Sequence, residues 1–196
     1  LSLALTFVII FTCYVKQQVA VNTHYPDSDN IYLVGIDQQT YSYYYMAEDL
    51  EAEIPEIEEA VHIEHYYNSY KYEGEVLSKE GLLEVGKDFF ELFQIKFLYG
   101  SPEDFDVKEN AFVTEGFARE HGMEEVIGKK LTNGKRTFII AGIIEDFSDT
   151  VFKDYEFVIN SKAFVPTPEK RRYSSGSVMT FIKAADGTDI GLLEEK

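Results

Sequence analysis

The first fifteen residues, LSLALTFVIIFTCYV, carry no charge, and the first charged side chain is Lys16. A transmembrane helix needs roughly 20 apolar residues to cross a bilayer core, so this stretch is slightly short. A secretory signal would have a basic segment ahead of its apolar run, and none stands here. We therefore predict a truncated transmembrane helix over residues 1–16. A buried core helix and a leftover secretory signal are the alternatives.

The distribution of charge indicates on which side of a membrane the remaining residues would lie. Between Lys16 and Lys71 the chain has no Lys or Arg. Basic residues near a span favour the cytoplasmic side, so their absence predicts that the folded part lies outside the cytoplasm. The whole chain has 35 acidic and 18 basic side chains and a formal charge of -17. This charge repels phosphate backbones, which argues against nucleic acid as a partner.

The first folded segment has the pattern of a strand, a helix and a second strand. A turn cluster at residues 24–30 precedes IYLVGI at Ile31–Ile36, a run that predicts a buried strand. Ser42 is expected to cap a helix that ends before Pro55. From Ile57 the apolar residues alternate with polar ones, which predicts a strand with one face turned inward.

The rest of the chain predicts further short strands with few helices. Thr114 is expected to cap a helix over Glu115–His121, and Asn133-Gly134 marks a β-hairpin. Asp88 is expected to cap a helical turn, and Asp189 to open a last helix. The strands are predicted at 68–73, 75–85, Gln94–Tyr99, Ala111–Thr114, 137–144, Tyr155–Ile159 and Val178–Ala184, and an exposed loop at 161–177.

No set of residues predicts catalysis or metal binding. His62 and His65 lie among eight carboxylates between Glu48 and Glu64, but without the HExxH spacing and on opposite faces of a strand. A solvated acidic face is the simpler interpretation. Cys13, the single cysteine, lies in the hydrophobic stretch, and the chain has no nucleophile elbow or nucleotide-binding glycine motif. We predict no catalytic, cofactor-binding or metal-ligating residue, and no cofactor.

Ten tyrosines lie between Tyr25 and Tyr72. An aromatic ring with a hydroxyl tip suits a half-wet contact surface, so these residues could stack on sugars or peptides. Half-buried positions on helices and strands explain most of them equally well. The region is therefore one candidate for a ligand surface.

Taken in chain order, the motifs resemble the extracytoplasmic core domain of MacB-like, FtsX-related ABC transporter permeases. The resemblance rests on the ordered set rather than on any single motif, and it covers nearly the whole chain. His121 stands where the family usually has Phe. The matching segments are HYPDSDNIYLV at His24–Val34, DFFELF at Asp88–Phe93, FLYGSP at Phe97–Pro102, AFVTEGFAREHG at Ala111–Gly122, IGKKL at Ile127–Leu131, FIIAGIIEDF at Phe138–Phe147 and FVINS at Phe157–Ser161.

The resemblance implies an α+β fold with two lobes, in which a porter-like βαβ lobe carries an inserted mixed, β-rich lobe. The corresponding divisions are a truncated transmembrane helix at 1–16, the first half of the porter-like lobe at 17–67 and the inserted mixed α/β lobe at 68–147. Residues 148–196 then return to the porter-like lobe, whose second half is truncated. The domain would lie in the periplasm, attached to the bacterial inner membrane by its N-terminal helix.

The function implied by the resemblance is mechanical. ATP-driven motion in the cytoplasm would be coupled to the periplasm for export or mechanotransmission, and ATP hydrolysis would take place on a separate or fused ATPase, so this chain is not expected to be an enzyme. The implied partners are a second permease copy, a cytoplasmic ABC ATPase and a periplasmic adaptor or substrate protein. The alternative is a membrane-anchored glycan- or peptide-binding module that uses the tyrosine-rich region.

Overall fold

The computed structural model describes residues 27–35, 40–67, 70–77, 81–132, 136–147, 150–161 and 178–195. The predicted transmembrane helix at 1–16 and nearly all of the predicted loop at 161–177 lie outside these residues. None of the helices that are described is long and apolar enough to span a membrane.

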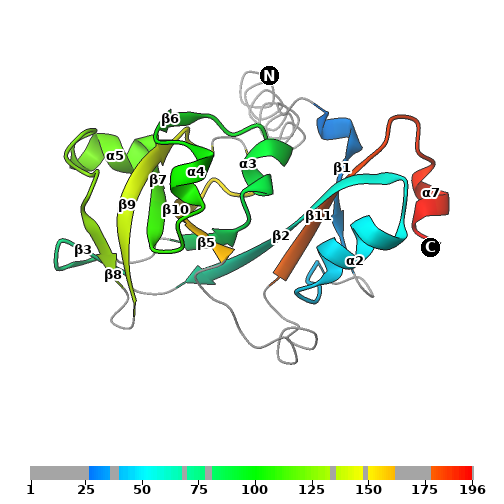
Figure 1. Cartoon of the computed structure of the whole chain (residues 1–196), viewed down its shortest axis with the longest axis horizontal. Helices are drawn as coiled ribbons and strands as arrows, with labels where there is room; N and C mark the ends of the chain where they lie inside the picture. The colour runs from blue at the N-terminus through cyan, green and yellow to red at the C-terminus, as the bar shows by residue number, and fades with distance from the viewer. Residues whose placement is uncertain are drawn as a thin grey trace, which may run out of the picture.

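The described residues form a large mixed sheet with short helices on both faces (Figure 1). This arrangement confirms the predicted α+β class. In chain order the elements are η1 (Ser28–Asn30), β1 (Ile31–Val34), α2 (Met46–Glu53), β2 (Ile57–Tyr67), β3 (Tyr70–Tyr72), β4 (Glu75–Leu77), β5 (Gly81–Val85), α3 (Asp88–Leu92), β6 (Phe97–Tyr99), α4 (Pro102–Phe105), β7 (Asn110–Thr114), α5 (Glu115–His121), β8 (Lys130–Thr132), β9 (Thr137–Ile144), β10 (Tyr155–Asn160), β11 (Val178–Ala184) and α7 (Ile190–Leu193).

The strands follow the order β1-β11-β2-β5-β10-β7-β9-β8-β3-β4, and β6 pairs with the end of β9. Two pairs of adjacent strands run parallel, β5 with β10 and β7 with β9. The remaining pairs are antiparallel. Strands that are distant in the sequence therefore become neighbours, and β10 lies between β5 and β7 rather than beside β11.

One end of the sheet is a split βαβ unit, here called the small lobe. It consists of β1, β11 and β2 with helices α2 and α7 (Figure 1, right). Both β1 and β2 run antiparallel to β11, so they are parallel to each other with β11 between them. Ala47 of α2 packs with Ala60 and Ile182 of the sheet, and Leu193 of α7 lies against the same cluster.

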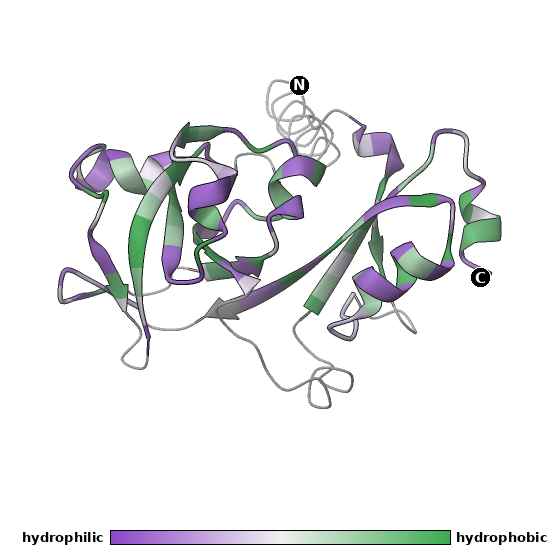
Figure 2. Cartoon of the chain, in the orientation of Figure 1, coloured by the Kyte–Doolittle hydropathy of each residue, from purple (hydrophilic) through white to green (hydrophobic). Residues whose placement is uncertain are grey.

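The other end of the sheet, here called the large lobe, has a hydrophobic core on each face. Phe89 and Phe90 of α3 and Phe105 of α4 are buried in one core. Phe117 of α5 is buried in the other core, together with Tyr72 of β3. Because β9 lies between the two cores, both of its faces are covered, and Figure 2 shows that it is hydrophobic along most of its length. The strand β2 is largely hydrophilic in the same view.

Several local predictions are confirmed. The hydroxyl oxygen of Thr114 accepts a hydrogen bond from the backbone N–H of Phe117, and Gly122 ends α5 at a φ of 91°. Asp189 caps α7 in the same way. The hairpin predicted at Asn133-Gly134 is present as the antiparallel pair of β8 and β9, although the turn residues 133–135 lie outside the described part.

The prediction that Ser42 caps a helix is wrong. Helix α2 begins at Met46, and its N-cap is Tyr45, whose side chain makes no capping hydrogen bond. Ser42 instead forms a single β-bridge with Val178, and its hydroxyl lies 2.6 Å from that of Thr180 in β11. Asp88 also differs slightly, because it lies in the first turn of α3 and Lys87 is the N-cap.

The close packing of β7 and β9 gives a prediction for stability. A Cβ atom at Gly142 of β9 would overlap the ring of Phe112, whereas one at Gly86 would meet no atom within 4 Å. We expect Gly142→Ala to lower the free energy of unfolding by about 1–3 kcal/mol through overpacking. Gly86→Ala is the control and should change it little. Urea denaturation of both variants measures this, and equal midpoints would contradict the packing described.

Candidate functional site

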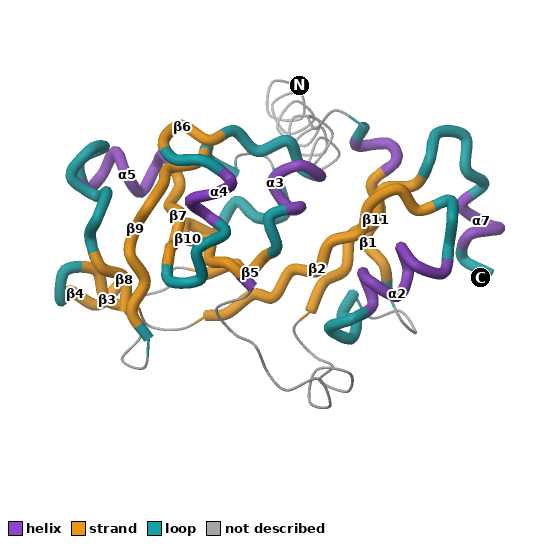
Figure 3. The backbone as a smooth tube through the Cα atoms, viewed as in Figure 1, coloured by secondary structure: helices purple, strands orange, loops and turns teal. Residues whose placement is uncertain are grey.

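The two lobes are joined by β2, which belongs to both. Its residues from Ile57 to Glu64 pair with β11, and those from Ile63 to Tyr67 pair with β5. Ile63 and Glu64 therefore have a partner strand on each side. Figure 3 shows β2 running without interruption from the small lobe to the large lobe. The hydrogen-bonded sheet is continuous across the junction.

A shared aromatic core reinforces this connection. Phe181 of β11, in the small lobe, packs edge-to-face against Phe93 and Phe152 of the large lobe, with ring centroids 5.3 Å and 5.8 Å away. Val61 and Ile63 of β2 are buried in the same cluster, as predicted from their alternation. Edge-to-face rings in van der Waals contact have specific geometry, so relative movement of the lobes would disrupt several contacts at once.

The opposite face of the junction holds buried polar groups. Glu64 of β2 and Glu84 of β5 are partners in register, and Glu84 has no exposed surface. The sequence placed Glu64 on a solvated acidic face, and this is incorrect for that residue, which is 9% exposed. Glu48, Glu51, Glu53 and Glu58 are exposed, as that interpretation expected. Glu84 was not identified as a candidate, although a carboxylate in the apolar run GLLEV was its signal.

The two histidines of β2 lie on opposite faces of the strand, as predicted. His62 is in register with Thr180 and His65 with Leu83, three positions apart along the strand. The ring of His62 lies 4.4 Å from that of Tyr44, and burial lowers the pKa of His65. Across the described residues, no group of three or more His, Cys, Asp or Glu side chains could hold a metal ion.

The tyrosine-rich region does not form one exposed platform within the described residues. Tyr44, Tyr70 and Tyr72 are buried, while Tyr41 is 39% exposed. Tyr72 packs edge-to-face against His121, which stacks on Phe117 at a centroid distance of 4.2 Å. The half-buried His121 therefore packs at the edge of this core through its ring.

Two cavities adjoin the small lobe. The larger one, of about 440 Å³, lies between α2, α7 and the sheet, and aliphatic side chains such as Leu50, Ile54 and Ile182 line it. The smaller one, of about 240 Å³, lies at the junction, where Glu51 of α2 faces the ends of β5 and β10. The carboxylate of Glu51 accepts a hydrogen bond of 2.5 Å from the backbone N–H of Ala60.

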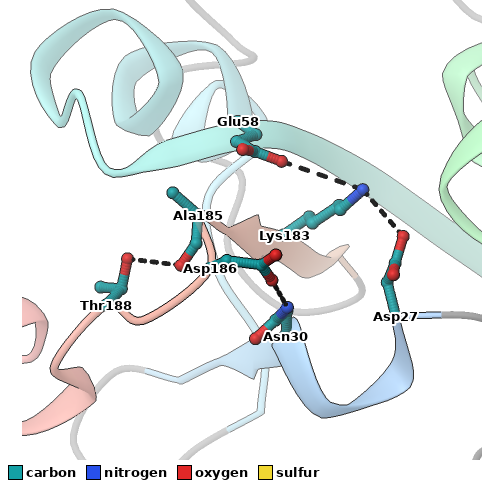
Figure 4. Close-up of polar contacts among 7 residues, drawn as sticks. All are labelled: Asp27, Asn30, Glu58, Lys183, Ala185, Asp186 and Thr188. Atoms are coloured by element: carbon teal, nitrogen blue, oxygen red, sulfur yellow. Dashed lines mark hydrogen bonds and ion pairs between the residues drawn. The ribbon is translucent and has the colours of Figure 1, made fainter.

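Polar contacts tie the first described turn to β11 (Figure 4). The ammonium of Lys183 lies 3.1 Å from a carboxylate oxygen of Asp27 and 3.8 Å from one of Glu58 in β2. Asn30 donates a hydrogen bond of 2.6 Å to Asp186, in the turn after β11. The hydrogen bond to Asp27 is the main cause that raises the pKa of Lys183. Sequence reasoning did not identify Lys183, although a lysine inside an apolar strand was a signal.

Residues 1–196 match the family described as the MacB-like periplasmic core domain. The chain belongs to this family. It is therefore a periplasmic core domain of a MacB- and FtsX-like ABC transporter permease, a class that is generally not enzymatic. No curated protein sequence matches it.

Solved structures share the fold of this MacB-like domain at low sequence identity. A domain assigned to a permease protein of Porphyromonas gingivalis is 16% identical, with a TM-score of 0.72 over 87% of this chain and 79% of that one. The periplasmic region of MacB from Actinobacillus actinomycetemcomitans is 14% identical, with a TM-score of 0.60 over 84% and 78%. The extracellular domain of the noncanonical ABC-type transporter YknZ from Gram-positive bacteria is 10% identical, with a TM-score of 0.58 over 83% and 86%.

The shared core predicts that one residue stabilises both lobes. We expect Phe181→Ala to lower the free energy of unfolding by about 3–5 kcal/mol, because it leaves a cavity between Phe93 and Phe152. Leu98→Ala, at a side chain that is 47% exposed, is the control and should cost far less. Urea denaturation of the purified domain measures both. A loss at Phe181 as small as that at Leu98 would contradict a shared core.

The lowered pKa of His65 predicts a pH dependence. Because burial disfavours its charged form, the unfolded chain binds a proton that the folded chain does not, in the interval below the ordinary pKa of about 6.5. Stability contributed by neutral His65 is therefore present above that pH and is lost as the pH falls. We expect His65→Gln to flatten the fall in unfolding free energy between about pH 7 and pH 5. Parallel pH profiles for variant and wild type would contradict this.

Proposed function

We propose that this domain couples ATP-driven motion of the permease to the periplasm, for export or for mechanotransmission. The observation that supports this most is the continuity of β2 across the two lobes, with Ile63 and Glu64 paired on both sides. A packed, hydrogen-bonded body moves as a unit because interiors are close-packed and not continuously deformable. Such a body suits the transmission of displacement and requires no catalytic residue of its own.

The proposed attachment and partners follow from the family. The domain would be held at the bacterial inner membrane by a helix at residues 1–16, with the folded part in the periplasm. Its partners would be a second permease copy, a cytoplasmic ABC ATPase that is fused or separate, and a periplasmic adaptor or substrate protein. ATP binding on the ATPase would supply the work, and the domain would pass it on.

We also propose a division of the chain into two lobes that departs from the boundary at residue 148. Residues 27–67 and 178–195 would form the porter-like lobe, and residues 70–161 the inserted lobe. The reason is that β10 pairs with β5 and β7, both of which belong to the inserted segment. The long strand β2 would then be the connection between them.

The alternative, a glycan- or peptide-binding module on a membrane anchor, has less support. Burial of Tyr44, Tyr70 and Tyr72 leaves fewer rings for stacking on a ligand than the sequence offered. A screen of the domain against glycans and peptides would favour this alternative if it found specific binding that substitution of the exposed Tyr41 removes.

The mechanical proposal can be tested in the full permease with its ATPase, reconstituted in nanodiscs. A spin label at the exposed position Glu103 in each copy reports the distance between the two large lobes. We expect ATP to change this distance in the unmodified complex. A flexible Gly-Ser insertion after Gln18 should remove the change while ATP hydrolysis continues, because slack in the connection absorbs the movement.

The matched control is the same insertion after Gly74, in the exposed turn between β3 and β4. This variant has the same added length at a place outside the proposed path, and it should keep the distance change. No effect of ATP on the unmodified complex would refute the proposal, as would an undiminished change after insertion at Gln18.

A further inference from the structure

The turn that leads into β1 contains an aspartate, Asp27, whose side chain contacts a distant lysine instead of capping the helix that follows. Asp27 occupies the N-cap of η1, where an aspartate ordinarily accepts a hydrogen bond from the first turn, but its side chain makes no such bond. Its φ of 64° lies in the left-handed region, which is uncommon for residues other than glycine. The carboxylate is directed instead to Lys183, 3.1 Å away.

The second carboxylate on Lys183 is positioned by an irregularity in β2. Lys183 is in register with Glu59, and the next residue, Ala184, with Ile57, so Glu58 is an extra residue in a β-bulge. Bulges redirect a side chain relative to regular pairing. Here the redirected Glu58 lies 3.8 Å from the ammonium of Lys183. One cation therefore contacts the N-terminal turn and β2 at once.

A second contact ties the same turn to the residues that follow β11 (Val178–Ala184). Asn30 donates to Asp186, so the turn is held both at Lys183 in the strand and just beyond it. We call Asp27, Asn30, Glu58, Lys183 and Asp186 the Lys183 clamp (Figure 4). Four other surface ion pairs, Lys96–Glu145, Lys108–Glu109, Arg119–Glu115 and Lys129–Glu73, lie within the large lobe and do not join it to the N-terminal turn.

We propose that Lys183 is a positioning residue that fixes the N-terminal turn to β11 and β2, so that displacement of the segment before Asp27 is passed directly to the sheet. This inference rests on the proposed mechanical function for its role in the permease. The path runs from Asp27 through Lys183 to Glu58 on β2, and β2 continues into the large lobe. Without the clamp, the turn would be held mainly by the short strand β1, at the edge of the sheet.

The first test measures whether the clamp holds the turn, by amide hydrogen exchange of the full permease in nanodiscs without ATP. We expect Lys183→Met to speed exchange of the amides from Asn30 to Val34 about fivefold, the effect of removing a partly exposed ion pair. Lys153→Met, which removes an exposed lysine elsewhere, is the control and should leave these amides unchanged. Unchanged protection of β10 in both variants shows that the fold is retained.

A double-mutant cycle separates the contact from general damage. Asp27→Asn should speed the same amides, and the double variant with Lys183→Met should show less than the sum of the two effects, because both remove one interaction. Lys183→Arg keeps the charge and should largely restore protection. Amides of β1 that exchange at the wild-type rate in Lys183→Met, or fully additive effects, would overturn the proposal.

The last test asks whether the clamp carries movement, using the ATP-driven distance change at position 103. We expect Lys183→Met to reduce this change while hydrolysis continues, and Lys153→Met to keep it. A full change in Lys183→Met would overturn the clamp and leave the mechanical function standing. If ATP does not change this distance in the wild type, the mechanical function is refuted, and with it the transfer of movement through Lys183. The hydrogen-exchange experiment would then still decide whether the Lys183 contact holds the turn.

Discussion

The connection between the two lobes depends on β2, which pairs with one strand of each lobe. Where β2 pairs with β11 and β5 together, at Ile63 and Glu64, the sheets of the two lobes become one. Backbone donors and acceptors in a buried strand must be paired, so sliding one lobe past the other would leave these groups without partners. The aromatic cluster of Phe93, Phe152 and Phe181 covers the same junction and adds a packing constraint to the hydrogen-bonding one.

A formal charge of -17 sets the second constraint. Excess negative charge weakens a compact fold through self-repulsion, most strongly where carboxylates are close and basic residues are few. The segment from residue 17 to 70 has no Lys or Arg, and Lys183 of β11 supplies a cation to it from a distant part of the chain. Asp27 and Glu58 therefore gain a neighbouring cation only when β11 inserts between β1 and β2.

Local signals in the sequence predicted the bounds of helices and strands better than they predicted which residues are in contact in the fold. The cap at Thr114, the glycine that ends α5 and the bounds of β11 all follow from interactions within a few residues, and they were predictable. Ser42 was misinterpreted because its partner, Thr180, is distant in the chain, and a hydroxyl before a helix resembles a cap whatever it contacts. Glu64 was assigned to the solvent for a similar reason, since nothing nearby in the sequence indicates that Glu84 lies opposite it.

By itself the sequence determined most of the strands and helices, though not α4 (Pro102–Phe105), because periodicity and capping residues are local properties. Its ordered motifs resembled one family, and that resemblance implied the class of fold. Only the tertiary structure decided which strands are neighbours, which carboxylates are buried and what Lys183 contacts. These depend on pairings between residues such as Asp27 and Lys183, which are remote in the chain and meet only after the sheet has formed. The sequence carries both partners of each contact, but the pairing itself is a property of the folded sheet.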